Sequence, residues 1–388
     1  MAVFFFCASA IFVLYVLFGY PIVLAVLSRR RPRSNRKQWT PATVSILIPA
    51  HNGARWIQDK LQSVGQLDYP SDLIQVIVID DGSTDDTSAL TKAAGVPGLE
   101  LLSIPRGGKA SALNAGMARA RGDILLFTDV RQKLEPGSLR SLVSCFADAS
   151  VGVVSGELMI LSGETQQEAD IGLYWHYEKW IRRRLSRLDS VLGATGCLYA
   201  MRRELAVQLP PNTLLDDVHL PLAAFFRGYR VIFDEGAKAF DYPTVLGSEF
   251  RRKVRTQAGI YQIVWAFPQL LLPTTRMWFH FGSHKLGRLM LPYAFLLLAL
   301  SSLGLPGVWR TPALTAQVAF YALAALDGWI PQRWPLKRVS SIARTFVVLV
   351  GAALCAPLFL ASNRRGASGW TTTDVQRAAA PSSANHGP

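Results

Sequence analysis

The stretch that decides the fold runs from Val44 to Arg131 and opens with VSILIPAHN at residues 44–52. Three further blocks follow, VIDDGSTDD at 78–86, GKASALNAG at 108–116 and GDILLFTDVR at 122–131. Short apolar runs alternate with segments of helical character. The runs are 44–49, 73–79, 101–104 and 124–127, and the helical segments are 57–66, 87–94 and 110–120. Buried strands alternating with helices predict an α/β fold with a Rossmann-like, mainly parallel sheet.

Polar residues gather where these strands end. Asp80 and Asp81 directly follow the second apolar run, and Gly82 allows a tight turn after them. Ligands of such sheets bind at the carboxyl ends of the strands. The adjacent carboxylates are well placed to accept hydrogen bonds from a base or ribose, whereas we expect Asp85 and Asp86 to be turn and helix-cap residues.

In combination, the four blocks resemble the opening of family 2 glycosyltransferases of the GT-A fold. The resemblance covers roughly a quarter of the chain and implies a nucleotide-diphosphate sugar donor. It implies that His51 and Asn52 neighbour the nucleotide and that Lys109 and Asn114 shape the pocket. Lys109 also has a physical case, because a cation there can meet the diphosphate; the alternative is a solvated lysine on a glycine loop. The donor-side residues are Pro49, His51, Asn52, Asp80, Asp81, Lys109, Asn114, Asp129 and Arg131.

The last block departs from the family pattern. The family usually has Asp-x-Asp after the fourth strand, for ribose and a divalent metal, but this chain has Asp129-Val130-Arg131. A Mg or Mn ion prefers oxygen ligands, and it could still bind Asp129 together with phosphate oxygens and water. Alternatively, Arg131 neutralises the diphosphate by bidentate hydrogen bonds. Gly53 also stands where many members have a glutamate.

A second acidic pair, Asp216-Asp217, resembles the pair before the acceptor-side helix of membrane-bound members. The resemblance makes Asp217 the general base, which is needed because a sugar hydroxyl loses its proton as it attacks the anomeric carbon. The alternative is a helix N-cap pair. We expect His219 to be an ordinary helix residue rather than a metal neighbour. The predicted acceptor loop contains Gly193, Thr195 and Gly196.

Arg255 aligns with the arginine of the Gln-x-x-Arg-Trp motif of cellulose- and hyaluronan-type synthases. Arg252 then replaces the glutamine and Thr256 replaces the tryptophan. The missing tryptophan argues against processive polymerisation, although Arg255 can still face the leaving diphosphate. The alternative is that the basic run 251–255 forms a face against lipid headgroups.

Long apolar segments at both ends predict a membrane protein. Residues 2–27 are nearly all apolar, and basic residues follow at 29–37, which places the next segment in the cytoplasm. Candidate spans near the other end are 290–305, 313–330 and 342–361. The expected organisation is a transmembrane helix at 1–28, a basic cytoplasmic linker at 29–42, a GT-A domain at 43–262, an interfacial segment at 263–285, about three transmembrane helices at 286–362 and a disordered tail at 363–388.

Composition limits the other function classes. Half of the residues are hydrophobic and the net charge is +14, but no nucleic-acid-binding motif is visible, so we expect membrane lipids rather than nucleic acid as partners. The four cysteines have neither zinc nor disulfide spacing.

The sequence therefore predicts an inverting glycosyltransferase of a bacterial inner membrane, with a glycan or lipid-linked acceptor. A nucleotidyltransferase would need a glycine-rich phosphate loop after its first strand, where this chain has Pro49-Ala50-His51. The remaining alternative is a non-catalytic membrane assembly or transport subunit with a degenerate domain.

Overall fold

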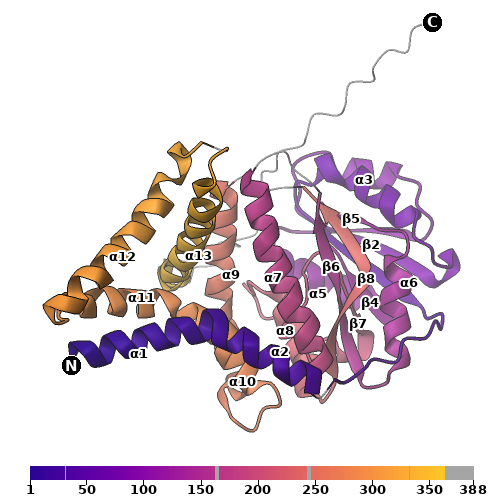
Figure 1. The fold of residues 1–388 in the computed structure, drawn as a ribbon. Helices are drawn as coiled ribbons and strands as arrows, with labels where there is room; N and C mark the ends of the chain where they lie inside the picture. Colours follow the sequence, from indigo (N-terminus) through magenta and orange to yellow (C-terminus); the bar gives the residue numbers. More distant parts are fainter. Residues whose placement is uncertain (31, 162–165, 243–245, 332, 363–388) are drawn as a thin grey trace, which may run out of the picture.

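A mixed sheet of eight strands forms the centre of the computed structural model, which describes residues 1–30, 32–161, 166–242, 246–331 and 333–362 (Figure 1). The strands are β1 (Val44–Ala50), β2 (Ile74–Asp81), β3 (Leu99–Ile104), β4 (Ile124–Phe127), β5 (Lys133–Leu134), β6 (Val151–Ile160), β7 (Tyr199–Arg202) and β8 (Arg230–Asp241). Their order is β3-β2-β1-β4-β7-β6-β8-β5. The four apolar runs are β1 to β4 and pair in parallel, which confirms the predicted mainly parallel sheet.

Strand β7 changes the direction of the sheet. It pairs antiparallel with β4 on one side and with β6 on the other, while β6 and β8 are parallel to each other. The edge strand β5 is antiparallel to β8. The carboxyl ends of β1 and β4 therefore lie at one edge of the sheet, directly beside the loop that leads into β7.

Helices cover both faces of the sheet, because side chains of successive strand residues point to opposite sides. Ile46 and Ile48 of β1 pack into one core with α3 (Ala54–Gly65) and α6 (Ser138–Ser144), and α4 (Thr87–Ala93) lies beside them. Leu47 packs into the other core, with α5 (Lys109–Arg119), α7 (Gln166–Leu188) and α8 (Asp216–Phe226). This second face also receives α9 (Leu246–Ala266) and the N-terminal helix.

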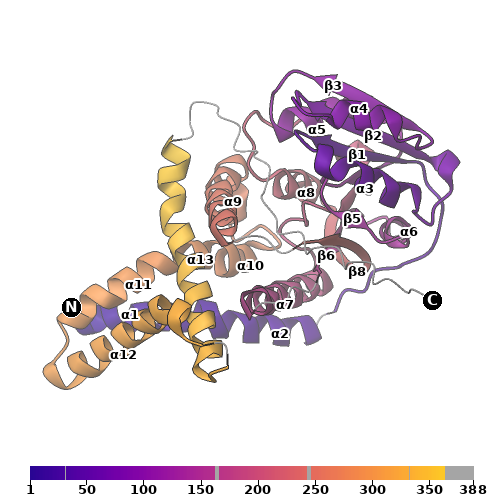
Figure 2. The same cartoon turned by 90° about the horizontal axis from the view of Figure 1, so that it is seen from above.

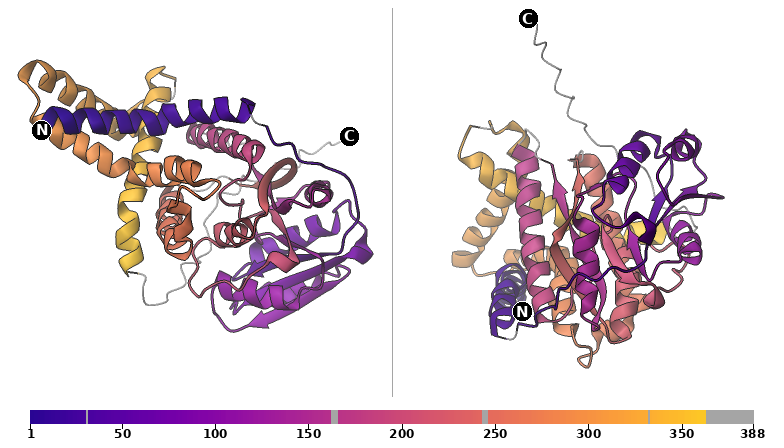
Figure 3. Two further views of the ribbon diagram at one scale, coloured as in Figure 1. Left: turned by 90° about the horizontal axis from the view of Figure 1, so that it is seen from below. Right: turned by 90° about the vertical axis from the view of Figure 1, so that its right-hand side faces the viewer.

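The chain has three helices that are long and apolar enough to cross a membrane among the residues described, namely Ala2–Arg30, Trp278–Leu303 and Leu336–Ser362. The first consists of α1 (Ala2–Leu14), η1 (Tyr15–Gly19) and α2 (Tyr20–Arg30), and it lies beside α7 (Figure 3). The second consists of α10 (Trp278–His280), η6 (Phe281–Leu286) and α11 (Gly287–Leu303), and the third is α13 (Leu336–Ser362). Both η1 and η6 are π-helical turns.

Some details differ from the expected organisation. Helix α12 (Gly307–Ala325), within which the candidate span 313–330 begins, is not among the three long apolar helices. The expected interfacial segment 263–285 contains the end of α9, a short turn, α10 and most of η6. The expected tail, 363–388, lies outside the described residues. The remaining short turns are η2 (Ser71–Leu73), η3 (Cys145–Ala147), η4 (Arg203–Leu205), η5 (Pro268–Leu271) and η7 (Leu326–Trp329).

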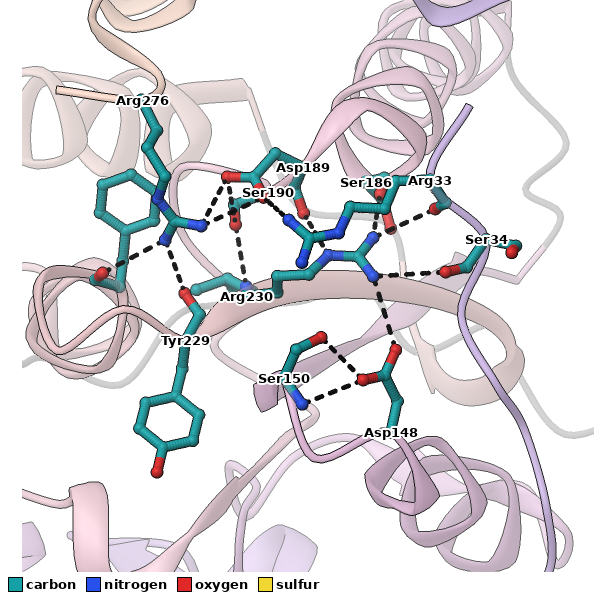
Figure 4. Close-up of polar contacts among 12 residues, drawn as sticks. Arg33, Ser34, Asp148, Ser150, Ser186, Asp189, Ser190, Tyr229, Arg230 and Arg276 are labelled. Atoms are coloured by element: carbon teal, nitrogen blue, oxygen red, sulfur yellow. Dashed lines mark hydrogen bonds and ion pairs between the residues drawn. The ribbon is translucent and has the colours of Figure 1, made fainter. Parts of the chain in front are cut away.

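A buried arginine joins the N-terminal helix to the sheet (Figure 4). Arg230 of β8 is 1% exposed, and its guanidinium donates to the carbonyl oxygens of Arg33 (3.2 Å), Ser186 (3.1 Å) and Asp189 (3.0 Å). The carboxylate of Asp148 lies 3.6 Å from it. The chain after α2 is thereby fixed against the end of α7, which holds the N-terminal helix in place relative to the sheet.

Replacement of Arg230 tests this junction. Arg230→Met leaves buried carbonyl groups without donors, and we expect it to lower the free energy of unfolding by about 3 kcal/mol. Thermal unfolding in detergent measures the effect. Arg119→Met is the control, since Arg119 pairs with Glu100 on the surface and such pairs contribute about 0–1 kcal/mol. Equal losses in the two variants would contradict the junction role.

Candidate active site

A cleft of about 350 Å³ opens at the carboxyl ends of β1 and β4. Its lining residues come from the loops after these strands, the first turns of α5 and α8, and parts of α7, α9, η6 and α11. Figure 2 shows how α5, α7, α8 and α9 are arranged beside the sheet. It brings together twelve of the predicted site residues, which are Pro49, His51, Asn52, Lys109, Asp129, Arg131, Gly193, Thr195, Gly196, Asp216, Asp217 and Arg255.

Three predicted donor residues do not line this cleft but organise the loops around it. Asp81 is fully buried, and its carboxylate accepts hydrogen bonds from the backbone amides of Gly107 (2.6 Å) and Gly108 (2.9 Å) and pairs with Arg106. Asp80 accepts from the amide of Ser83 and the hydroxyl of Ser88. The Asn114 side chain exchanges two hydrogen bonds with the backbone of Leu209.

The loop after β1 is tied to the loop after β2. Asn52 has a left-handed backbone (φ 49°), and its side-chain oxygen accepts from the Thr84 amide at 2.9 Å. The backbone N–H of Asn52 donates to the Ser83 hydroxyl. His51 Nδ1 lies 2.9 Å from the Asp81 carbonyl oxygen. These bonds place His51 and Asn52 at the mouth of the cleft.

Lys109, the first residue of α5, lies between two carboxylates. Its Nζ is 2.9 Å from Asp129 Oδ1 and 3.3 Å from Asp216 Oδ2. Burial opposes the charge of Lys109, but Asp129, Asp216 and Asp217 outweigh it and raise its pKa. The side chain is 18% exposed, so the alternative of a solvated lysine is wrong.

Asp217 is a weaker acid in the cleft than an ordinary aspartate. Burial raises its pKa to about 6 and Asp216 adds to the rise, while Lys109 and Arg182 oppose it. Leu215 is the N-cap of α8 and makes no side-chain cap bond, so Asp216 and Asp217 lie in the first turn instead of capping the helix. The N-cap alternative is therefore wrong.

A glycine loop fits closely around Asp217. The amide of Ala194 donates to the Asp217 carbonyl oxygen at 2.7 Å. A Cβ on Gly196 would lie 2.9 Å from Asp217 Oδ2, and Gly193 has a φ of +132° that side chains rarely adopt. Gly196 is needed because the loop approaches the carboxylate too closely for a side chain, and Gly193 because of its φ and because a Cβ would lie 2.8 Å from Val218 Cγ2.

Arg131 pairs with a carboxylate other than those around Lys109. Its guanidinium pairs with Asp241 at 2.6 Å, and Gln132 donates to the same carboxylate oxygen. Of Asp129 and Arg131, Asp129 is the one that can bind a metal, and its side chain is 36% exposed. No group of three or more His, Cys, Asp or Glu residues positioned for a metal occurs among the residues described. A cation here would take most of its ligands from a bound diphosphate and water.

Other cleft residues were not anticipated as site residues. Arg182 and Glu178 of α7, Lys285 of η6 and Arg288 of α11 line the wall next to the membrane helices. Arg182 belongs to a basic run in the sequence, but only the fold brings it near Asp217. Arg252 and Lys253 of α9 line the cleft beside the predicted Arg255, and His219 packs against Phe267 as an ordinary helix residue.

Buried Lys60 of α3 supports the floor of the cleft. Its Nζ donates to the Thr128 hydroxyl and to the Gln132 carbonyl oxygen, on either side of Asp129. The Thr128 hydroxyl donates in turn to the carbonyl of Cys197 in the glycine loop. Burial lowers the pKa of Lys60 to about 7. The loop after β4 and the glycine loop before β7 are therefore connected through Lys60 and Thr128.

Comparison with known proteins shows sequence similarity to glycosyltransferases. The model for "Glycosyl transferase family 2" matches residues 45–209. "Probable glycosyltransferase YdaM" of Bacillus subtilis is 25% identical over 240 residues, which are 58% of this chain and 56% of that protein. "Glycosyltransferase AglE" of Haloferax volcanii is 26% identical over 239 residues, 59% of this chain and 76% of that protein. The chain thus spans little more than half the length of YdaM.

A solved structure confirms the fold. The mannosyltransferase PcManGT of Pyrobaculum calidifontis, in complex with GDP-mannose and Mn²⁺, superposes with a TM-score of 0.74 at 20% identity. The likeness covers 93% of this chain and 99% of that one. The predicted GT-A architecture is confirmed, and the similarity to glycosyl transferase family 2 spans residues 45–209 of this chain.

Proposed function

We propose that this chain is an inverting glycosyltransferase that moves a sugar from a nucleotide-diphosphate donor to a hydroxyl acceptor. The product would belong to exopolysaccharide, glycolipid or envelope glycan synthesis. One observation carries the proposal. The carboxylate of Asp217, with its pKa raised to about 6, lies in the same cleft as the ion-paired Lys109. The names of the two relatives, both glycosyltransferases, support the reaction class.

The three carboxylates near Lys109 have different roles in this proposal. Asp129 and Asp216 share the lysine, whereas Asp217 retains a raised proton affinity suited to a base. The acceptor hydroxyl oxygen forms a bond to the anomeric carbon from the face opposite the diphosphate. The bond between that carbon and the diphosphate oxygen breaks, its electron pair leaves with the nucleotide, and the hydroxyl proton moves to Asp217. Lys109 and Arg255 offset the charge that develops on the diphosphate.

A divalent cation, Mg or Mn, also belongs to the proposal. Asp129 would supply one carboxylate ligand, and diphosphate oxygens and water would supply the others. When bound, the cation would neutralise charge on the departing diphosphate. PcManGT was solved with Mn²⁺, which supports this assignment.

We place the catalytic domain on the cytoplasmic side of a bacterial inner membrane. The three long apolar helices support membrane association, and the basic residues after the first of them support the orientation. The partners are then a nucleotide-sugar donor from the cytoplasm and a glycan or lipid-linked acceptor at the membrane.

A panel of nucleotide sugars tests the reaction class directly. The full-length protein is purified in detergent, and release of nucleoside diphosphate from each labelled donor is measured. We expect hydrolysis or transfer with at least one donor. If wild-type protein processed no donor under any condition, the alternative of a non-catalytic assembly or transport subunit would replace this proposal.

The base assignment predicts both a mutant effect and a pH profile. We expect Asp217→Asn to lower the transfer rate about 100-fold or more, because general bases contribute roughly 10² to 10⁴. For the wild type, kcat/KM should fall about tenfold per pH unit below the pKa of about 6, where Asp217 becomes protonated. Full transfer by the Asn variant would rule out this role.

The glycine loop predicts a geometric effect. Gly196→Ala adds a Cβ 2.9 Å from Asp217 Oδ2 and should displace the carboxylate. We expect transfer to fall about tenfold or more, because small misplacements of reacting groups are costly. Gly137→Ala is the matched control, since its Cβ would meet no atom within 4 Å. A wild-type kcat in the Gly196→Ala variant would show that the close fit is irrelevant.

Removal of the metal gives a further expectation. Exhaustive chelation should lower transfer about 100-fold, and added Mg or Mn should restore it, because only Lys109 and Arg255 would then face the diphosphate charge. The rate is followed by release of the labelled diphosphate. Undiminished transfer after chelation would favour neutralisation by cationic side chains alone.

A further inference from the structure

The cleft has one wall that belongs to a candidate membrane span. Lys285 of η6 and Arg288 of α11 line the cleft and lie within the apolar helix Trp278–Leu303. Arg182 lines the cleft from α7, which packs against α2 of the first candidate span. An acceptor held at this wall would therefore reach the cleft from the membrane side, opposite the donor residues at the ends of β1 and β4.

The charges of this wall are only partly balanced. Glu178 forms an ion pair with Arg288, which accounts for one cation. The guanidinium of Arg182 donates to neutral oxygens, the Thr195 hydroxyl at 2.7 Å and the Ala194 carbonyl at 3.5 Å. Within the described part of the chain, neither Arg182 nor Lys285 forms an ion pair with a carboxylate. On the donor side, by contrast, Lys109 and Arg131 have carboxylate partners.

Arg182 and Lys285 are neighbouring cations, and neither has a carboxylate within ion-pair distance among the described residues, so this wall is suited to an anionic ligand. Partly desolvated charges are stabilised by a counter-ion, and arginine and lysine are the residues that bind phosphate. Basic pockets beside membrane helices bind the anionic headgroups of lipids. The Ala194–Thr195 loop that anchors Arg182 also binds the Asp217 backbone at 2.7 Å. A phosphate bound by Arg182 would therefore lie beside the proposed base.

We propose that the acceptor is a membrane lipid with a phosphodiester headgroup that carries a free hydroxyl, bound through its phosphate by Arg182 and Lys285. This rests on the proposed glycosyltransferase function. The hydroxyl oxygen bonds to the anomeric carbon, its proton moves to Asp217, the nucleoside diphosphate leaves with the electron pair, and the phosphodiester is unchanged. A phosphate monoester acceptor already has an anionic nucleophile and needs no base, so the presence of Asp217 favours a hydroxyl beside the phosphate.

Acceptor specificity tests the proposal with the full-length protein in phosphatidylcholine nanodiscs. The acceptors are phosphatidylglycerol, which has both groups; diacylglycerol, which has only the hydroxyl; polyprenyl phosphate, which has only the phosphate; and soluble glycerol phosphate, which has no lipid. We expect label from the donor to appear on phosphatidylglycerol about tenfold more efficiently than on the other three. Equal transfer to diacylglycerol, or preference for polyprenyl phosphate or glycerol phosphate, would overturn the proposal.

Variants of Lys285 identify the phosphate contact. Lys285→Gln should raise the apparent KM for phosphatidylglycerol about tenfold, which is equivalent to roughly 1.4 kcal/mol. The KM for the donor should rise by a smaller factor. Lys285→Arg should restore most of the loss. Lys92→Gln is the matched control, because Lys92 is an exposed residue of α4 outside the cleft. An unchanged KM for phosphatidylglycerol in Lys285→Gln would overturn the assignment.

Lipid binding without donor separates the two proposals. Native mass spectrometry of the detergent-solubilised protein measures retention of phosphatidylglycerol against diacylglycerol. Selective retention of phosphatidylglycerol that is lost in Lys285→Gln supports the lipid site, even if no donor is hydrolysed and the transferase proposal fails. Donor hydrolysis by a protein that retains both lipids equally would leave the transferase proposal standing and overturn this one.

Discussion

The ion pairs of Lys109 are the interaction on which the rest of the cleft depends. Asp129 follows β4 and Asp216 begins α8, and both carboxylates lie within 3.3 Å of Lys109 Nζ. Without this cation, three neighbouring carboxylates would repel one another, and burial would favour their protonated forms. The lysine is placed by the loop before α5, which Asp81 organises through the amides of Gly107 and Gly108. The acidic turn after β2 thus acts on the cleft through this loop.

In the proposed reaction, the cleft has a donor side and a membrane side. The donor side is built from the ends of β1 and β4 and the first turn of α5, and its cations have carboxylate partners. The membrane side is built from α7, η6 and α11, where Arg182 binds neutral oxygens and Lys285 lies on a span. Asp217 is in the first turn of α8, and Figure 2 shows α8 between α5 and α7. This arrangement suits a reaction between a soluble donor and an acceptor from the membrane.

Much of the fold and part of the site could be predicted because their signals are local. The four apolar runs became β1 to β4, since a strand buried on both faces must be apolar along its length. The family blocks identified Lys109 and Asp129, which the structure brings to 2.9 Å. The contacts of Asp81 were not predictable. Its partners Gly107 and Gly108 lie more than 20 residues away, and no local pattern shows which loop a carboxylate will organise.

The sequence by itself determined the alternation of strands and helices, the long apolar segments and the chemical types at the strand ends, because each depends on residues close together in the chain. Only the tertiary structure decided which charges meet. Glu178 pairs with Arg288 across 110 residues, and Arg182 reaches the loop beside Asp217. Burial within that packing, rather than residue type, raises the pKa of Asp217. The membrane-side wall of the cleft exists only because α7 and the helix Trp278–Leu303, which lie far apart in the sequence, line the same cleft.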